Sequence, residues 1–308
     1  MNRMPAALGH DRSPTPRRRL FACSFGAVTA GLLVLATGAS ADLLTPESGG
    51  SPNADDIDSL YKLVLAVAVV VFVGVEGALL YSLIKFKARK GAVAAQIRGN
   101  TNLEIGWTVG AAVVLVVLAV VTFVKLDEIR TPPNSDAGGF QATADGVLSA
   151  SAFRPEPPDG KALNIKVNGQ QYIWRYTYPD GDENILNNAF SYEEMVVPTN
   201  TTVTLDIDAQ DVAHSWWIPA LGGKFDAIPG HTNYTWFKVP EPGVYSGQCA
   251  ELCGRNHANM VATVRAVEPA EFERWLAAKR REIGQSNAAA QKAREKIEAQ
   301  QQTGDEAP

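Results

Sequence analysis

The chain has 308 residues, of which 46% are hydrophobic, 20% charged and 8% aromatic, and its formal net charge is −5. This composition excludes a collagen-like, mucin-like or wholly disordered protein, and the acidic balance argues against a nucleic-acid-binding protein. The length suggests about two domains.

Residues 1–41 are predicted to form a signal peptide that is removed from the mature protein. Arg17–Arg19 make a basic start, residues 25–38 are mostly small and apolar, and Ala39–Ala41 offer a small-residue cleavage site. The alternative is a cytoplasmic tail followed by a third membrane helix. Residues 42–58 would then be an external segment at the start of the mature chain.

Two apolar runs, Leu63–Ile84 and Ile105–Val124, predict a transmembrane helical hairpin over residues 59–130. About 20 apolar residues span a bilayer, so we expect helices at about 61–85 and 105–125. A buried helix pair in a soluble protein is the less favoured alternative. The loop between the two runs is rich in lysine and arginine, which keeps such loops cytoplasmic. Everything after the hairpin is therefore expected outside the membrane.

The external part is predicted to be all-β. Residues 131–160 are rich in Pro, Gly, Ser and Asp, which is typical of a linker. Over residues 161–268 the pattern changes to short stretches rich in Val, Ile, Thr and Tyr, which favours a β-sandwich or barrel. Strands are expected at 163–168, 171–178, 192–197, 202–208, 232–238 and 259–267. Residues 269–308 are predicted to be an amphipathic helix that opens at Pro269, followed by a polar tail.

One segment near the end of this β region carries the chemistry. It contains Cys249, Cys253, His257 and Met260, and His214 lies upstream. Thiolate, imidazole and thioether ligands together suit copper. A single-copper electron-transfer site needs one cysteine, whereas here a second one follows after four residues. The economical interpretation is two copper ions bridged by both thiolates, with one histidine on each. Met260 would be a weak ligand of one copper and a backbone carbonyl a ligand of the other.

Three other interpretations fit these residues. Cys249 and Cys253 form a disulfide in an oxidising compartment, or they bind a single zinc ion together with His214 and His257. In the third interpretation they belong to a copper chaperone.

At this point the sequence resembles subunit II of the haem–copper cytochrome c oxidases. The resemblance rests on the Cys-x3-Cys-x3-His-x2-Met run, on His214-Ser215-Trp216 and on residues 223–230. Residues 103–108 and 127–129 are similar to the ends of the family's second membrane helix. The resemblance implies a two-helix anchor and an external cupredoxin domain with a Greek-key β-sandwich, which carries a binuclear copper A centre.

The resemblance also implies a role for each site residue. His214, Cys249, Cys253, His257 and Met260 would bind copper through their side chains, and Glu251 through its main-chain carbonyl. The carboxylate of Glu251 would point to a magnesium ion at the contact with the catalytic subunit, where a hard cation prefers oxygen ligands. A solvated loop carboxylate is the alternative for Glu251.

Electron relay candidates follow from the same resemblance. Residues 170–176 are similar to the family's aromatic strand, although Tyr172 stands where many members have tryptophan. Tyr172 and Trp174 are candidates for receiving electrons, and Trp216 for passing them on, with core packing as the alternative for each. Nearby acidic residues are expected to steer a basic donor or to form a plain solvated face. They are Asp180, Asp182, Glu183, Glu193 and Glu194.

The function predicted from these features is the electron-accepting subunit of a proton-pumping cytochrome c oxidase. It would take electrons from cytochrome c and pass them to haem in subunit I, beside subunit III and membrane lipid. The expected location is the bacterial inner or plasma membrane, with the C-terminal domain on the outer face. The non-enzyme alternative is a membrane-anchored protein that delivers copper during oxidase assembly. A quinol oxidase subunit is disfavoured because that branch lacks the copper ligands.

Overall fold

The computed structural model describes residues 44–87, 90, 91, 93, 95–140, 155–179 and 187–305. The predicted signal peptide lies outside these residues, as do the middle of the predicted linker and the acidic residues Asp180, Asp182 and Glu183. The described parts of the linker, residues 131–140 and 155–160, contain no helix or strand.

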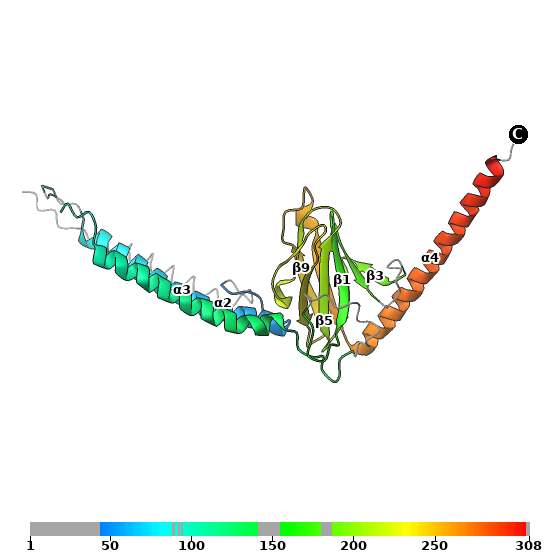
Figure 1. Ribbon diagram of the computed structural model, residues 1–308, viewed down its shortest axis with the longest axis horizontal. Helices are drawn as coiled ribbons and strands as arrows, with labels where there is room; N and C mark the ends of the chain where they lie inside the picture. Colours follow the sequence, from blue (N-terminus) through cyan, green and yellow to red (C-terminus); the bar gives the residue numbers. More distant parts are fainter. Residues whose placement is uncertain are drawn as a thin grey trace, which may run out of the picture. The chain divides into compact units, whose positions relative to one another are not determined.

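Two long apolar helices come first, as predicted. Helix α2 spans Pro52–Lys85 and helix α3 spans Thr101–Arg130, with 34 and 30 residues, and the two pack side by side (Figure 1). Both are long and apolar enough to cross a membrane, and none of the most apolar stretch of either is buried inside the protein. They exceed the predicted helices because their polar ends are also helical. The start of α3, for example, is capped by Asn100, whose side chain accepts a hydrogen bond from the backbone of Leu103 at 3.2 Å.

The rest of the fold is a sandwich of two five-stranded sheets (Figure 1). The first sheet has the strand order β3-β2-β1-β5-β8, and the second β4-β10-β9-β6-β7. The strands of the first sheet are β1 (Leu163–Gln170), β2 (Ile173–Tyr178), β3 (Ala189–Tyr192), β5 (Thr202–Ala209) and β8 (Asn233–Lys238). The strands of the second are β4 (Glu194–Pro198), β6 (His214–Trp217), β7 (Phe225–Ala227), β9 (Gly243–Cys249) and β10 (Val261–Val267). Strands β1 and β5, and likewise β4 and β10, pair in parallel, whereas the other pairs are antiparallel.

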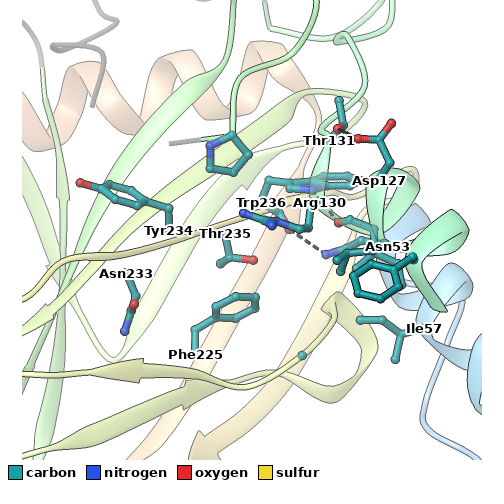
Figure 2. Close-up of a pocket in the computed structure, with 15 residues that line it drawn as sticks. Asn53, Ile57, Asp127, Arg130, Thr131, Phe225, Asn233, Tyr234, Thr235 and Trp236 are labelled. Carbon is teal, nitrogen blue, oxygen red and sulfur yellow. Dashed lines mark hydrogen bonds between the residues drawn. The ribbon is translucent and has the colours of Figure 1, made fainter. Parts of the chain in front are cut away.

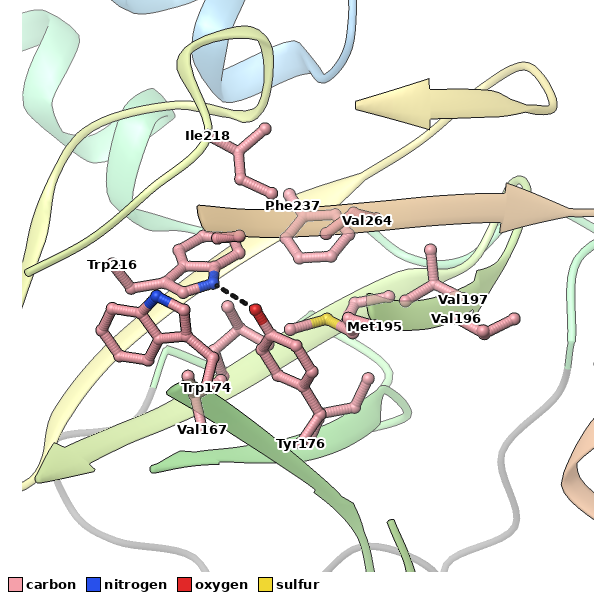
Figure 3. Packing of buried hydrophobic residues seen from close by; sticks show 14 of the residues in the cluster. Val167, Trp174, Tyr176, Met195, Val196, Val197, Trp216, Ile218, Phe237 and Val264 are labelled. Atoms are coloured by element: carbon pink, nitrogen blue, oxygen red, sulfur yellow. Dashed lines mark hydrogen bonds between the residues drawn. The ribbon is translucent and has the colours of Figure 1, made fainter. Parts of the chain in front are cut away.

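The core lies between the sheets and follows from alternation along the strands. Val203, Leu205 and Ile207 on β5 share one face of the strand, because every second residue points the same way, and all three are fully buried. The residues between them are largely buried too, so both faces of β5 are covered. Figure 3 shows how large side chains fill the middle, where the indole nitrogen of Trp216 donates to the hydroxyl of Tyr176 at 3.3 Å. Such packing makes the sandwich a stiff support for the loops at its ends.

Several strands differ from the predicted ones. The predicted strand 192–197 begins only at Glu194, as β4, because the chain turns at Glu193, whose φ is 62°. Predicted strand 171–178 begins only at Ile173, since residues 171 and 172 form a turn. Four strands were not predicted at all, namely β3, β6, β7 and β9. Three of them have four residues or fewer, and β9 contains two glycines, which weaken a strand signal.

The C-terminal helix α4 (Pro269–Asp305) begins at the predicted proline and continues without a break through Gly284. Phe272, Leu276 and Ile283 on its first half are buried against the β domain. The polar tail that follows is part of the same helix.

Candidate metal centre

The candidate site is a loop that joins β9 to β10 and lies beside the start of β6. Strands β6 and β9 are neighbours, with Trp216 opposite Cys249, and the backbone of Ala250 donates to the carbonyl of Ser215 at 2.8 Å. The loop closes on itself because the backbone of Cys249 donates to the carbonyl of Met260, also at 2.8 Å. Two pieces of chain that are distant in sequence are thus fastened together by sheet hydrogen bonds.

All six predicted ligand groups meet in this loop and at the start of β6. The sulfur of Cys249 lies 3.9 Å from Nδ1 of His214, 3.9 Å from the sulfur of Cys253 and 3.2 Å from the carbonyl oxygen of Glu251. The sulfur of Cys253 lies 3.6 Å from Nδ1 of His257 and 3.9 Å from the sulfur of Met260. Each cysteine sulfur therefore faces one histidine nitrogen.

Both cysteines are free thiols, each at most 4% exposed, and their sulfurs are far outside the disulfide bonding distance of about 2.05 Å. Burial raises the pKa of the Cys253 thiol to about 11, and the neighbouring Cys249 adds to the effect. A metal ion must therefore displace protons to bind here. Two cysteine thiols and a thioether would supply soft ligands, and imidazole also suits copper, so the residues present fit a copper site.

The side chain of His214 is also held through Nε2, the ring nitrogen that does not face Cys249. Nε2 lies 2.9 Å from Oδ1 of Asp211, and the imidazole is completely buried. The backbone of Gly169 lies close to the ring, since an added Cβ there would be 3.0 Å from Cδ2 of His214. With the Nε2 proton bound to the carboxylate, Nδ1 keeps its lone pair and faces Cys249.

The carboxylate of Asp211 is itself firmly held. Burial alone would raise its pKa, but hydrogen bonds from His214 and from the backbones of Gln171 and Val212 outweigh burial, so that the pKa lies below its ordinary value. The carboxylate of Asp211 is therefore ionised, and it accepts a hydrogen bond from Nε2 of His214.

The three aromatic relay candidates occupy different environments. Tyr172 is partly exposed and lies over the loop, so that a Cβ added at Gly254 would come 2.6 Å from its hydroxyl. Trp174 is fully buried, with its ring edge-on to His214 at a centroid distance of 5.8 Å. Trp216 is 2% exposed and stacks on Phe237 in the core.

Sequence reasoning missed two residues of the site. Asp211 stands three residues before His214, and this short spacing to a candidate ligand was a usable signal. Gln171 carries no such signal, because its contact with Cys253 joins residues 82 positions apart.

A pocket of about 650 Å³ lies elsewhere, among the outer ends of α2 and α3 and residues of β8 (Figure 2). Asn53, Arg130 and Trp236 are among the residues that line it, and it contains none of the six ligand groups.

Comparison with known proteins gives consistent matches. The family profile "Cytochrome C oxidase subunit II, periplasmic domain" matches residues 163–267, and the profile of the transmembrane domain matches residues 40–124. The chain is 33% identical over 244 residues to the "Probable cytochrome c oxidase subunit 2" of Rickettsia bellii, which covers 74% of this chain and 81% of the relative. It is 30% identical over 302 residues to the "Cytochrome c oxidase subunit 2" of Cereibacter sphaeroides, which covers 83% of this chain and 90% of the relative.

Among solved structures, the periplasmic domain of subunit II of the cytochrome oxidase of Bradyrhizobium japonicum is 37% identical. That match covers 39% of this chain and 95% of that domain, with a TM-score of 0.36.

Proposed function

The chain belongs to the cytochrome c oxidase subunit II family, and from that premise we propose that its external domain accepts electrons from cytochrome c at a binuclear copper centre. The electrons then pass to haem in the catalytic subunit, where oxygen is reduced to water. The chain is a membrane-anchored protein with an external domain. The bacterial inner or plasma membrane is the proposed location, and the catalytic subunit, subunit III and cytochrome c are the proposed partners.

One observation carries this proposal: two imidazoles, a thioether and a backbone carbonyl converge on two adjacent thiols. His214, Cys249, Cys253, His257 and Met260 are the proposed side-chain ligands, with the carbonyl of Glu251 as the sixth. A bound copper pair supplies a site that takes up and releases one electron at a time.

The chain's own residues prepare this site in three ways. The buried thiols lose their protons as metal binds, and Asp211 keeps Nδ1 of His214 free of a proton. The paired strands β6 and β9 hold His214 and Cys249 in place. The positions of these ligands would therefore change little when the bound copper gains or loses an electron. Met260 and Cys249 are 1% and 2% exposed, which keeps water away from the ligands.

The side chain of Glu251 is exposed, and we assign it to a magnesium ion at the contact with the catalytic subunit. Its backbone carbonyl already faces Cys249, so that the carboxylate remains available for a second metal. Oxygen ligands of this kind suit a hard cation.

Metal analysis of the purified full-length chain tests the function directly. After copper loading under reducing conditions and mild oxidation, we expect two copper ions per chain and the intense visible bands of a mixed-valence pair. The alternative, a copper-delivery protein, predicts a single Cu(I) that is bound reversibly and gives no such bands. One copper or none per chain would contradict the oxidase assignment.

Tyr172 is the aromatic residue that we propose receives the electron. It is reachable from solvent and contacts the loop beside Cys253, whereas Trp174 is buried behind His214. The acidic chain would attract a basic donor to this surface.

The Tyr172→Leu variant should slow the reduction of the copper centre by cytochrome c by roughly an order of magnitude, since misplaced reacting groups cost up to about 100-fold. The copper bands should stay unchanged, because Tyr172 is not a ligand. Stopped-flow reduction measures the rate. The control is Tyr192→Leu, which changes an aromatic side chain on β3 that is 47% exposed. Equal rates in the two variants would remove Tyr172 from the electron path.

A further inference from the structure

The turn between β1 and β2 is joined to the loop between β9 and β10 by one side-chain hydrogen bond. The side-chain amide of Gln171 donates to the carbonyl oxygen of Cys253 at 2.6 Å. Within the part of the chain that the structure describes, this is the only hydrogen bond that reaches residues 251–254 from outside the loop. Those four residues follow the end of β9, where sheet pairing no longer holds the backbone.

Gln171 is also connected, through Asp211, to the ligand His214 on β6. The backbone nitrogen of Gln171 donates to Oδ2 of Asp211 at 2.7 Å, and the other oxygen of that carboxylate contacts His214. A continuous chain of hydrogen bonds therefore runs from His214 through Asp211 and Gln171 to Cys253. It links the ligand on β6 to the ligand in the middle of the loop.

The loop also rests directly on this turn. Gly254 has a φ of +134°, a conformation that favours glycine, and an added Cβ would lie 2.9 Å from Nε2 of Gln171. The sulfur of Cys253 faces three other ligand atoms, those of Cys249, His257 and Met260. A shift of its backbone would alter all three spacings at once.

We propose that Gln171 is a positioning residue of the metal centre: its amide fixes the backbone of Cys253 and thereby the spacing of that sulfur from the other ligands. The effect of Gln171 on copper binding rests on the proposed copper site, whereas the hydrogen bond to Cys253 is present in the metal-free chain. Loss of the amide would leave the fold intact, because the bond from the backbone of Gln171 to the carboxylate of Asp211 does not involve the Gln171 side chain.

The test is the Gln171→Met variant of the full-length chain, which keeps the length of the side chain and removes its donor. In the reduced, metal-free protein, we expect amide hydrogen exchange in residues 251–257 to quicken about 3- to 10-fold, the range that one net hydrogen bond supplies. Exchange in β1 and β10 should not change. After copper loading, release of copper to a chelator should quicken by a similar factor. The hyperfine pattern of the electron paramagnetic resonance signal should then show the unpaired electron shared unevenly.

The matched control is Gln170→Met, one residue away, whose amide bonds to Asn168 and does not touch the loop. It should behave like the wild type in every measurement. Unchanged loop exchange in Gln171→Met would overturn the inference whether or not copper binds, and so would an unchanged hyperfine pattern in the loaded protein. Fewer than two copper ions in the wild type would instead overturn the proposed function.

Discussion

Replacement of Cys249 by serine should lower the copper content from two ions to at most one per chain and remove the mixed-valence bands. The sulfur of Cys249 faces three groups of the ligand set, namely His214, Cys253 and the carbonyl of Glu251. A serine hydroxyl is a poor ligand for copper and cannot bridge two ions as a thiolate does. Electron transfer from cytochrome c should fall more than roughly 100-fold, because even groups that only support a metal ligand are worth 10- to 100-fold.

The serine variant should nevertheless fold. The backbone contacts that hold Cys249, to Met260 and to Trp216 of the neighbouring β6, do not involve its side chain. Circular dichroism and metal analysis on the same sample separate loss of metal from loss of fold. Val244→Ser, at a position of β9 that is 63% exposed, is the control and should keep both copper ions. A Cys249→Ser protein with two copper ions and native bands would show that the ligand assignment is wrong.

The general architecture follows from local sequence patterns. Two long apolar runs predict the membrane hairpin, and short stretches rich in Val, Ile, Thr and Tyr, such as the one with Val203, Leu205 and Ile207, predict strands. The family matches and the structure confirm this fold class. The cluster of Cys249, Cys253, His257 and Met260 was visible because all four residues lie within one loop.

What the sequence could not predict depends on contacts between distant segments. Strand β9 includes Gly247, where a Cβ would collide with the carbonyl of Trp217 on β6. A glycine that weakens the strand signal is therefore what allows these two strands to approach. Gln171 likewise acts only through a contact that the fold creates, whereas Asp211 was overlooked although it stands near His214.

Asp211 gives the second large prediction. Its carboxylate accepts from three donors: Gln171 and Val212 through their backbones, and His214 through Nε2. Asparagine has the same shape but only one oxygen, so that its NH2 group must face one of these donors. If the NH2 group takes the place of Oδ2, the backbone N–H of Gln171 loses its acceptor. If it takes the place of Oδ1, the backbone N–H of Val212 loses its acceptor, and His214 must present an unprotonated Nε2 and carry its proton on Nδ1, the atom that faces Cys249.

We therefore expect Asp211→Asn to weaken copper binding by about 10- to 100-fold, the usual effect of removing a group that orients a histidine ligand. Competition with a chelator measures the affinity. Nitrogen-15 chemical shifts of His214 in the metal-free chain report directly which ring nitrogen carries the proton. The control is Asp208→Asn, because Asp208 bonds to Asn168 and touches no ligand. Because the pKa of Asp211 is lowered in the fold, the wild-type carboxylate is charged at every pH near neutrality, and the difference between the two proteins should not depend on its titration. Wild-type affinity together with an unchanged His214 spectrum in Asp211→Asn would mean that the buried packing around Gly169 and Trp174 alone orients the imidazole.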